Sequence, residues 1–275
     1  HYEHPLEGDE FSNEIYSGIT NYELHLRYYN QCLVYAGLPY AFHTVGSSMA
    51  VKSSAYQKQG GMNKRKAGED FYLLHKSIPL GNCGEVNATA IYPSPRASDR
   101  VPFGTGRAVG EWLSGDQNEY MTYNPHIFED LKNFLTQADS YFSITENDIQ
   151  IQLELLPSSI REFLSANDFD HKIMEVKSQS TNIDTFRKRF YQWFDGFRVL
   201  KYVHFARDHY YANIHLLDLY DIEIIDEVNR IYLTNHDIEI ENRNEYVSFF
   251  HYSGNPNVTL DGFKYPLNDY NLRYK

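Results

Sequence analysis

The chain has 275 residues, of which 42% are hydrophobic and 16% aromatic, and its formal net charge at pH 7 is -12. This apolar content excludes a disordered chain, and the negative charge argues against general affinity for nucleic acid. Two cysteines, Cys32 and Cys83, cannot build a disulfide framework, and no run of about 18 apolar residues exists. We therefore expect a cytoplasmic protein without a transmembrane segment.

The beginning of the chain reads as the middle of a protein. It opens on His1-Tyr2-Glu3-His4-Pro5 without an initiator methionine, so we expect a fragment or a processed chain. From Glu10 to about Ala36, apolar and aromatic residues recur every three or four positions, which predicts a long amphipathic helix. Gly37-Leu38-Pro39 is expected to end it.

Small side chains follow in the next segment. Tyr40 to Val51 is predicted to be a strand, and within it Gly46, Ser47 and Ser48 would let the backbone approach a bulky ligand. A helical turn is expected around Ser53 to Lys58. The Gly60-Gly61 pair that follows permits positive φ angles and a hinge.

An acidic pair, Glu69-Asp70, opens a helix predicted to run to about Ser77. The helix dipole favours an ionised carboxylate at this position, and such a carboxylate could take a proton from a substrate hydroxyl. On its own, however, an acidic pair at a helix start is more often a simple cap.

The following segment completes the predicted α/β part. Val86 to Tyr92 alternates as a strand does, and helices between strands indicate an α/β layer. Residues 93–106 form a proline- and glycine-rich loop that contains Arg96 and Arg100. Arginine suits phosphate oxygens because its planar fork is bidentate, but a solvated linker between domains explains the loop nearly as well.

After Asn124-Pro125 the chain becomes helical in character. Helices are predicted at residues 126–138 and 149–156, after Pro157, and at residues 182–211. The Asp168-Phe169-Asp170 sequence is better explained by helix capping than by metal binding. The tail from about residue 222 shows strand-like alternation and turns, which suggest a small hairpin.

The helix predicted at residues 182–211 has two interpretations. Its basic residues, among them Arg187, Lys188 and Arg189, are interleaved with Trp193 and several other aromatic residues. Such a helix could make peripheral contact with the inner face of the cell membrane, through residues 186–211, or with a lipid-linked ligand. A core helix whose aromatic stripe is covered by arginine and lysine stems is the favoured interpretation.

Several of these elements together resemble a known family. The order Gly46-Ser-Ser-Met-Ala-Val-Lys52, then a tyrosine and Gly60-Gly61, then Gly68-Glu69-Asp70 before an aromatic residue resembles the second half of the catalytic domain of family 2 glycosyltransferases. This resemblance implies an α/β fold class, with a partial GT-A layer in residues 1–115 and a mainly helical extension in residues 125–275. It also implies inverting transfer of a sugar from a nucleotide-sugar to an acceptor hydroxyl, on a saccharide or lipid-linked acceptor.

The resemblance also implies roles for individual residues. Asp70 would be the general base, and Glu69 would orient the site or assist it. A divalent cation, Mg²⁺ or Mn²⁺, would neutralise the diphosphate, with His75 as a candidate ligand because it falls one helical turn after Asp70. The remaining candidates would border the acceptor and the donor sugar (His43, Gly46, Ser47 and Ser48) or bind the diphosphate (Arg96 and Arg100).

The chain departs from that family in one important respect. The nucleotide-binding half, with a strand-ended Asp-x-Asp motif, is not in this sequence. We therefore expect the chain alone neither to hold the nucleotide tightly nor to turn over. The alternative from another class is a non-catalytic helical module that binds a partner or docks on a membrane. A hydrolase with Glu69 and Asp70 as paired acids is disfavoured, because adjacent helix residues do not face each other across a bond.

Overall fold

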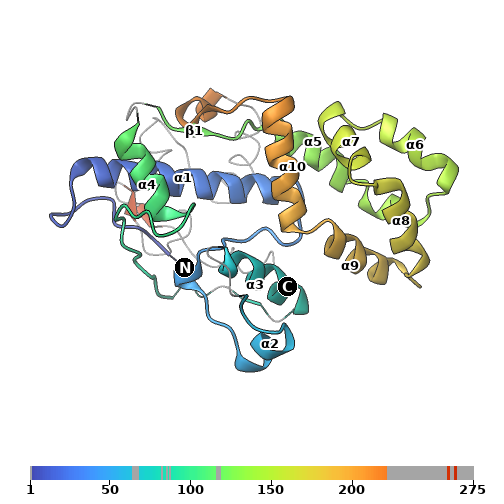
Figure 1. Ribbon diagram of the computed structural model, residues 1–275, viewed down its shortest axis with the longest axis horizontal. Helices are drawn as coiled ribbons and strands as arrows, with labels where there is room; N and C mark the ends of the chain where they lie inside the picture. Colours follow the sequence, from blue (N-terminus) through green and yellow to red (C-terminus); the bar gives the residue numbers. More distant parts are fainter. Residues whose placement is uncertain are drawn as a thin grey trace. The chain divides into compact units, whose positions relative to one another are not determined.

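The computed structural model describes residues 2–63, 68–81, 83–84, 86, 88–115, 119–221, 259–260 and 263–264. Its elements are shown in Figure 1. The chain divides into two compact units, each assembled from separate segments. Unit 1 comprises His1–Tyr28, Phe42–Tyr120 and His215–Lys275, and unit 2 comprises Tyr29–Ala41 and Met121–Ile214.

The predicted α/β fold class, with its partial GT-A layer, is wrong. The described residues are mostly helical, and their strands form only two sheets of two strands each. In the first sheet β1 (Met121–Thr122) pairs with β2 (Ile214–His215), and in the second β3 (Thr259–Leu260) runs antiparallel to β4 (Phe263–Lys264). Such short pairs cannot make the sheet face on which layers of helices pack in an α/β fold.

Neither strand predicted in the first hundred residues is present in the described part of the chain. The predicted strand at 40–51 instead contains the 3-10 helix η1 (Gly46–Ser48). In the segment predicted as a strand at 86–92, the described residues make a single bridge, between Ile91 and Tyr2. The small residues of the first segment have low β propensity, and alternation alone does not supply a neighbouring strand with which to pair.

The helices of unit 1 follow the sequence predictions more closely. Helix α1 (Asn13–Tyr35) confirms the predicted amphipathic helix, and its part up to Tyr28 belongs to this unit. The helical turn predicted around Ser53 to Lys58 is α2 (Ser53–Lys58), and the helix predicted after the acidic pair is α3 (Glu69–Ser77). Besides η1, the described 3-10 helices of this unit are η2 (Ile78–Leu80) and η4 (Leu216–Asp221).

Helix α4 (Thr105–Ser114) was not predicted, because glycines flank and interrupt it. It is held by packing rather than by propensity. Trp112 of α4 is almost fully buried against Gly18 of α1, where an added Cβ would lie 2.6 Å from its indole Cδ1. Close packing of this kind commonly overrides local sequence preference.

Unit 2 is helical. After the end of α1 and the short strand β1, its elements are α5 (His126–Leu135), η3 (Ala138–Phe142), α6 (Glu146–Glu154), α7 (Ser158–Ser165), α8 (Phe169–Ser178), α9 (Ile183–Trp193) and α10 (Gly196–His209). Helix α7 packs against α5, α8 and α10, while α9 packs against α8 and η3. Helices predicted at 126–138 and 149–156 are confirmed by α5 and α6, but the one predicted at 182–211 is two helices.

An aromatic cluster forms the core of unit 2. Phe134 lies at its centre, with ring centroids 4.9 Å from Phe194 and 5.6 Å from Phe169. Rings from α9 and η3 complete the cluster, and Phe190 and Tyr141 among them have no exposed surface.

Among the described residues, no helix has both the length and the apolar character that a membrane crossing requires.

Candidate functional site

The carboxylate of Asp70 lies against the backbone of Gly46 in unit 1. Its Oδ1 accepts a hydrogen bond from the backbone N–H of Phe71 at 2.7 Å, which holds the side chain at the start of α3. A Cβ added to Gly46 would overlap Asp70 Oδ2 and would lie 2.9 Å from the aspartate Cβ. The structure therefore brings together the acidic pair and the small-residue segment, and a side chain at position 46 would displace the carboxylate.

Within the described part of the chain, the Asp70 carboxylate has no cation paired with it. The side chain is partly exposed, as are Glu69 and Gly46, and Ser47 beside it is exposed. No lysine, arginine or histidine among the described residues forms an ion pair with Asp70. The oxygens of an ionised carboxylate can accept a hydrogen bond from a ligand hydroxyl. The Ser48 hydroxyl is less able to donate a hydrogen bond to a ligand, because it already donates to Val45 O at 3.2 Å.

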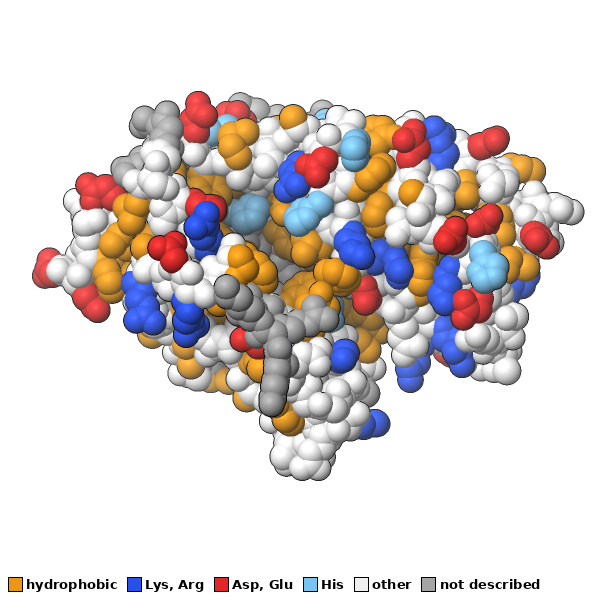
Figure 2. Space-filling model, viewed as in Figure 1, with side chains coloured by type: hydrophobic (Ala, Val, Ile, Leu, Met, Phe, Trp, Pro, Cys, Tyr) orange, Lys and Arg blue, Asp and Glu red, His pale blue; other side chains and the backbone are white. Residues whose placement is uncertain are grey.

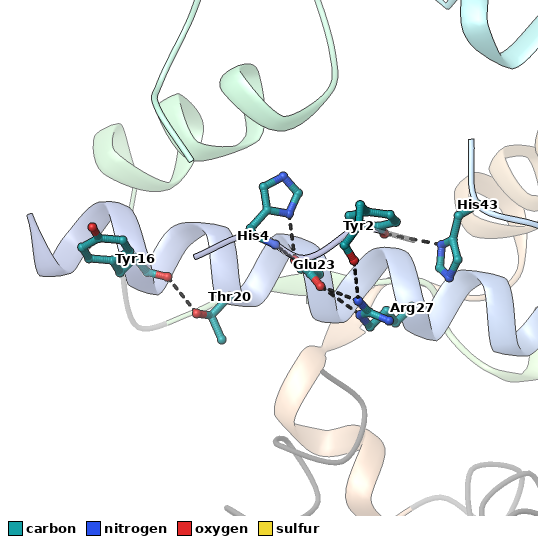
Figure 3. A network of polar contacts seen from close by, with 7 residues as sticks. All are labelled: Tyr2, His4, Tyr16, Thr20, Glu23, Arg27 and His43. Carbon is teal, nitrogen blue, oxygen red and sulfur yellow. Dashed lines mark hydrogen bonds and ion pairs between the residues drawn. The ribbon is translucent and has the colours of Figure 1, made fainter. Parts of the chain in front are cut away.

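The segment that leads to Gly46 is tied to α1 through a buried polar network (Figure 3). Glu23, which has no exposed surface, accepts hydrogen bonds from Arg27 Nε at 3.0 Å and from His4 Nδ1 at 2.7 Å. Arg27 in turn donates to the backbone carbonyl of Tyr2 at 3.2 Å, and the Tyr2 hydroxyl lies 3.4 Å from His43 Nδ1. His43 is thereby positioned three residues before Gly46.

Sequence reasoning missed this network. Glu23 and Arg27 are four residues apart and so lie on one face of α1, which usually marks a solvent-exposed pair. The signal that could have revealed it is their position on the helix face that also contains Ile19, which is fully buried. A charged pair on the apolar face of a helix is expected to be internal and to have further partners.

Burial sets the charge state of the predicted sugar-binding histidine. It lowers the pKa of His43 to about 3, with the Arg27 guanidinium acting in the same direction and Glu23 opposing it. Burial likewise raises the pKa of the Tyr2 hydroxyl. At neutral pH His43 is therefore an uncharged imidazole, which can form hydrogen bonds but cannot neutralise a phosphate.

His75, the candidate metal ligand, lies in an aromatic environment. Its ring centroid is 4.2 Å from that of Phe71 and 5.1 Å from that of Phe42. Among the described residues, no group of three or more histidine, cysteine, aspartate or glutamate side chains could hold a metal ion. The role of His75 as a metal ligand therefore stays a prediction.

Arg96 and Arg100, the predicted diphosphate ligands, are both exposed in the loop that precedes α4. This loop is closed at its base by a hydrogen bond of 2.9 Å from Ser98 N to Gly106 O. The backbone N–H of Arg100 donates to the Ser98 hydroxyl at 3.3 Å. The structure describes no contact between either arginine and Asp70.

In the stretch 186–211 of unit 2, the aromatic stripe is internal and the basic residues are largely paired. Phe186, Phe190 and Trp193 are buried, while Arg187 donates to both carboxylate oxygens of Asp139, at 2.7 and 2.5 Å. Arg189 donates to the Gln179 side chain at 3.0 Å. On the face shown in Figure 2, basic side chains are interspersed with acidic ones. These contacts are those of core helices, α9 and α10, whose outer faces are solvated.

One family model matches part of this chain. It describes the vitamin B1 binding domain of thiamin pyrophosphokinase and matches residues 235–275. Of these, the structure describes residues 259–260 and 263–264, which belong to β3 and β4. No curated protein and no solved structure matches the chain. The predicted membership of the family 2 glycosyltransferases is wrong, since the matching family is a different one and the helical fold does not fit a GT-A layer.

Proposed function

We propose that unit 1 holds the acceptor side of a glycosyl transfer site in which Asp70 is the general base. The observation that supports this proposal is the Asp70 carboxylate, partly exposed, without an ion-pair partner among the described residues, and lying against Gly46. Glycine at position 46 leaves room for the carboxylate itself, which a Cβ there would overlap. Ser47 is exposed and follows Gly46 in the chain, so in this proposal its hydroxyl contacts the ligand.

The proposed reaction needs one proton acceptor on the protein. Asp70 takes the proton of the acceptor hydroxyl as that oxygen attacks the anomeric carbon of a nucleotide-sugar. The new carbon–oxygen bond forms on the face opposite the leaving group. The bond to the diphosphate breaks, and the nucleoside diphosphate departs with the electron pair, which inverts the configuration. The divalent cation, Mg²⁺ or Mn²⁺, stays a prediction, and no step is assigned to it.

A donor that needs no nucleotide-binding residues tests the role of Asp70. An α-glycosyl fluoride has its own leaving group, so fluoride release that depends on an added alkyl glycoside reports transfer. We expect Asp70→Asn to reduce this rate by about 10²- to 10⁴-fold, the usual contribution of a general base. Equal rates for Asp70→Asn and the wild-type chain, or no acceptor-dependent release at all, would refute the proposal.

The alternative of a helical interaction or membrane-docking module has less support. The membrane-docking surface would be residues 186–211. Its large aromatic side chains, Phe186, Phe190 and Trp193, are buried in the core of unit 2, and Arg187 donates a hydrogen bond to Asp139. Binding to anionic vesicles that is lost in Arg187→Ala would favour it. Vesicle binding independent of that arginine would argue against it.

We infer a second candidate function, thiamin binding by residues 235–275, from the family match alone. Hydrogen exchange of the full chain with and without thiamin tests it. Protection confined to peptides from residues 235–275 supports the inference, whereas identical exchange in both samples refutes it. Asp70→Asn should leave any such protection unchanged, which separates the two candidate functions.

A further inference from the structure

Phe103 is a large aromatic residue on the surface of unit 1, with 55% of its area exposed. It lies in the loop that Ser98 N and Gly106 O close, so its backbone is held in place at both ends. Gly104, directly after it, has a φ of +94° and precedes the first residue of α4. The loop therefore presents the phenyl ring instead of burying it.

The ring of Phe103 contacts the start of α3. Its Cζ atom lies 3.2 Å from the position that a Cβ on Gly68 would take. Gly68 adopts a left-handed conformation with φ of +75°, and the acidic pair follows it directly. Because consecutive Cα atoms are about 3.8 Å apart, the Cα atoms of Gly68 and Asp70 are at most about 7.6 Å apart. The exposed ring thus contacts the residue that lies two positions before Asp70 in the chain.

An exposed phenyl ring and a carboxylate can together bind a sugar. One face of a pyranose ring is formed by axial C–H groups, which bear a small positive charge, while its hydroxyls point outward around the ring. The face of a phenyl group is electronegative and attracts such C–H groups. A neighbouring carboxylate can then accept a hydrogen bond from one of the hydroxyls. An aliphatic or peptide ligand would gain little from a single ring and one acceptor in this arrangement.

We propose that Phe103 is the stacking platform for the acceptor saccharide, beside the Asp70 carboxylate. This inference rests on the proposed function, since it names the residue that binds the acceptor at that site. Phe103 orients the sugar so that one hydroxyl faces Asp70, and it contributes to acceptor binding and not to proton transfer. Its ring contacts Gly68, two residues before the proposed base.

Saturation-transfer difference NMR on the full chain tests this inference without requiring turnover. The probes are the methyl glycosides of glucose, galactose, mannose and N-acetylglucosamine. We expect at least one of them to receive saturation on the protons of one ring face when the aromatic protein signals are irradiated. Phe103→Ala should abolish that transfer or weaken binding by about tenfold or more, corresponding to the loss of one aromatic stacking contact. Phe103→Trp should retain it.

The matched control is Tyr92→Ala. Tyr92 is exposed by 66%, and its substitution should leave glycoside binding unchanged. Equal binding by Phe103→Ala and the wild-type chain, or no binding of any of the four glycosides, would overturn the inference. Asp70→Asn separates it from the proposed function. Glycosides that bind through Phe103 in a chain whose fluoride release does not depend on Asp70 would sustain the platform while refuting the base.

Discussion

At Glu23, the protein buries a carboxylate completely and surrounds it with donors. Arg27 supplies two hydrogen bonds to Oε1, and His4 supplies its backbone N–H and its Nδ1–H to Oε2. These contacts hold Glu23 and Arg27 as a charged pair, and burial of either charge without the other would be costly. Because the same network reaches His43, it stabilises the segment that leads to Gly46.

Glu23→Gln should therefore destabilise the protein strongly. The substitution leaves the Arg27 cation buried without its counter-charge, which typically costs about 3–5 kcal/mol of unfolding free energy. Urea denaturation measures the loss. Glu14→Gln, at an exposed position of the same helix, is the control and should leave the midpoint almost unchanged. Equal midpoints for both variants would contradict the buried pair.

A second prediction concerns Gly46. In Gly46→Ala the new methyl group overlaps Asp70 Oδ2, so the carboxylate must move. Displacement of a catalytic group by about 1 Å can reduce a rate by about 100-fold, and we expect a loss of that order in acceptor-dependent fluoride release. Ser47→Ala adds no bulk and should lower the rate far less. Full activity in Gly46→Ala would show that the carboxylate does not act from this position.

A third prediction follows from the pKa of His43, which burial lowers from 6.5 to about 3. Below about pH 6.5 the unfolded chain binds a proton at this residue that the folded chain does not bind. The stabilising contribution is therefore complete above that pH and is lost as the pH falls toward 3. We expect the unfolding free energy of His43→Asn to fall less steeply between about pH 6.5 and pH 4 than that of the wild-type chain.

The ring signals of His43 in NMR spectra provide the second readout. They should not titrate between about pH 8 and pH 5, because the folded-state pKa lies well below that interval. His25 of α1, whose pKa burial lowers to about 4, should behave in the same way. A titration midpoint near pH 6.5 for His43 would place its ring in solvent.

At the scale of single elements, the interruption between α9 and α10 shows what helical periodicity cannot reveal. The apolar pattern continues from residue 182 to 211, yet the chain leaves the helical conformation at Phe194, which has φ of -90° and ψ of 62°. Asp195 then caps α10 by accepting a hydrogen bond from Arg198 N at 2.9 Å. Aspartate is a common helix cap, so Asp195 could have indicated a helix start. The aromatic pattern, however, continues across this position and predicts one uninterrupted helix.

Asp195→Ala should weaken unit 2 by about 0.5–2 kcal/mol, because the first turn of α10 loses the acceptor for one backbone N–H group. Denaturation followed by circular dichroism measures the loss. Asp170→Ala changes a carboxylate in the first turn of α8, for which no cap hydrogen bond is present in the described residues, and should cost clearly less. Equal losses in both variants would indicate that the cap at Asp195 contributes nothing.

Helices α1, α2 and α3 could be predicted because their patterns are local: periodic apolar positions, a glycine break and acids in a first turn. Helix α4 and the missing strands could not, since they depend on partners distant in sequence. Trp112 requires Gly18, and a strand at 40–51 would require a neighbour that the fold does not provide. The juxtaposition of Asp70 and Gly46 was expected, whereas the contact of Phe103 with Gly68 had no sequence signal.

At the scale of the whole molecule, each unit contains one of the two tryptophans of the sequence. Trp112 lies in unit 1 and Trp193 in unit 2, and each is 8% exposed. Single-tryptophan variants, Trp193→Phe and Trp112→Phe, therefore report the unfolding of units 1 and 2, respectively. Buried indoles change their emission on exposure to water, so each transition can be followed separately.

Phe134→Ala tests whether the units differ in stability. It removes the central ring of the aromatic cluster in unit 2 and should cost about 3–5 kcal/mol there. We expect the transition reported by Trp193 to move to lower urea by more than the one reported by Trp112. Coincident shifts at both tryptophans would show that the two units unfold as a single cooperative body.

The order of segments also sets an order of assembly on the ribosome. All residues of unit 2 have been synthesised by Ile214, whereas unit 1 still awaits its last segment, including the hydrogen bond of 2.7 Å from Leu216 N to Tyr120 O. Nascent chains are made at about 5–20 residues per second, and domains generally fold as units. The segments of unit 1 that precede Met121 therefore wait, without this hydrogen bond, through the synthesis of nearly a hundred residues of unit 2.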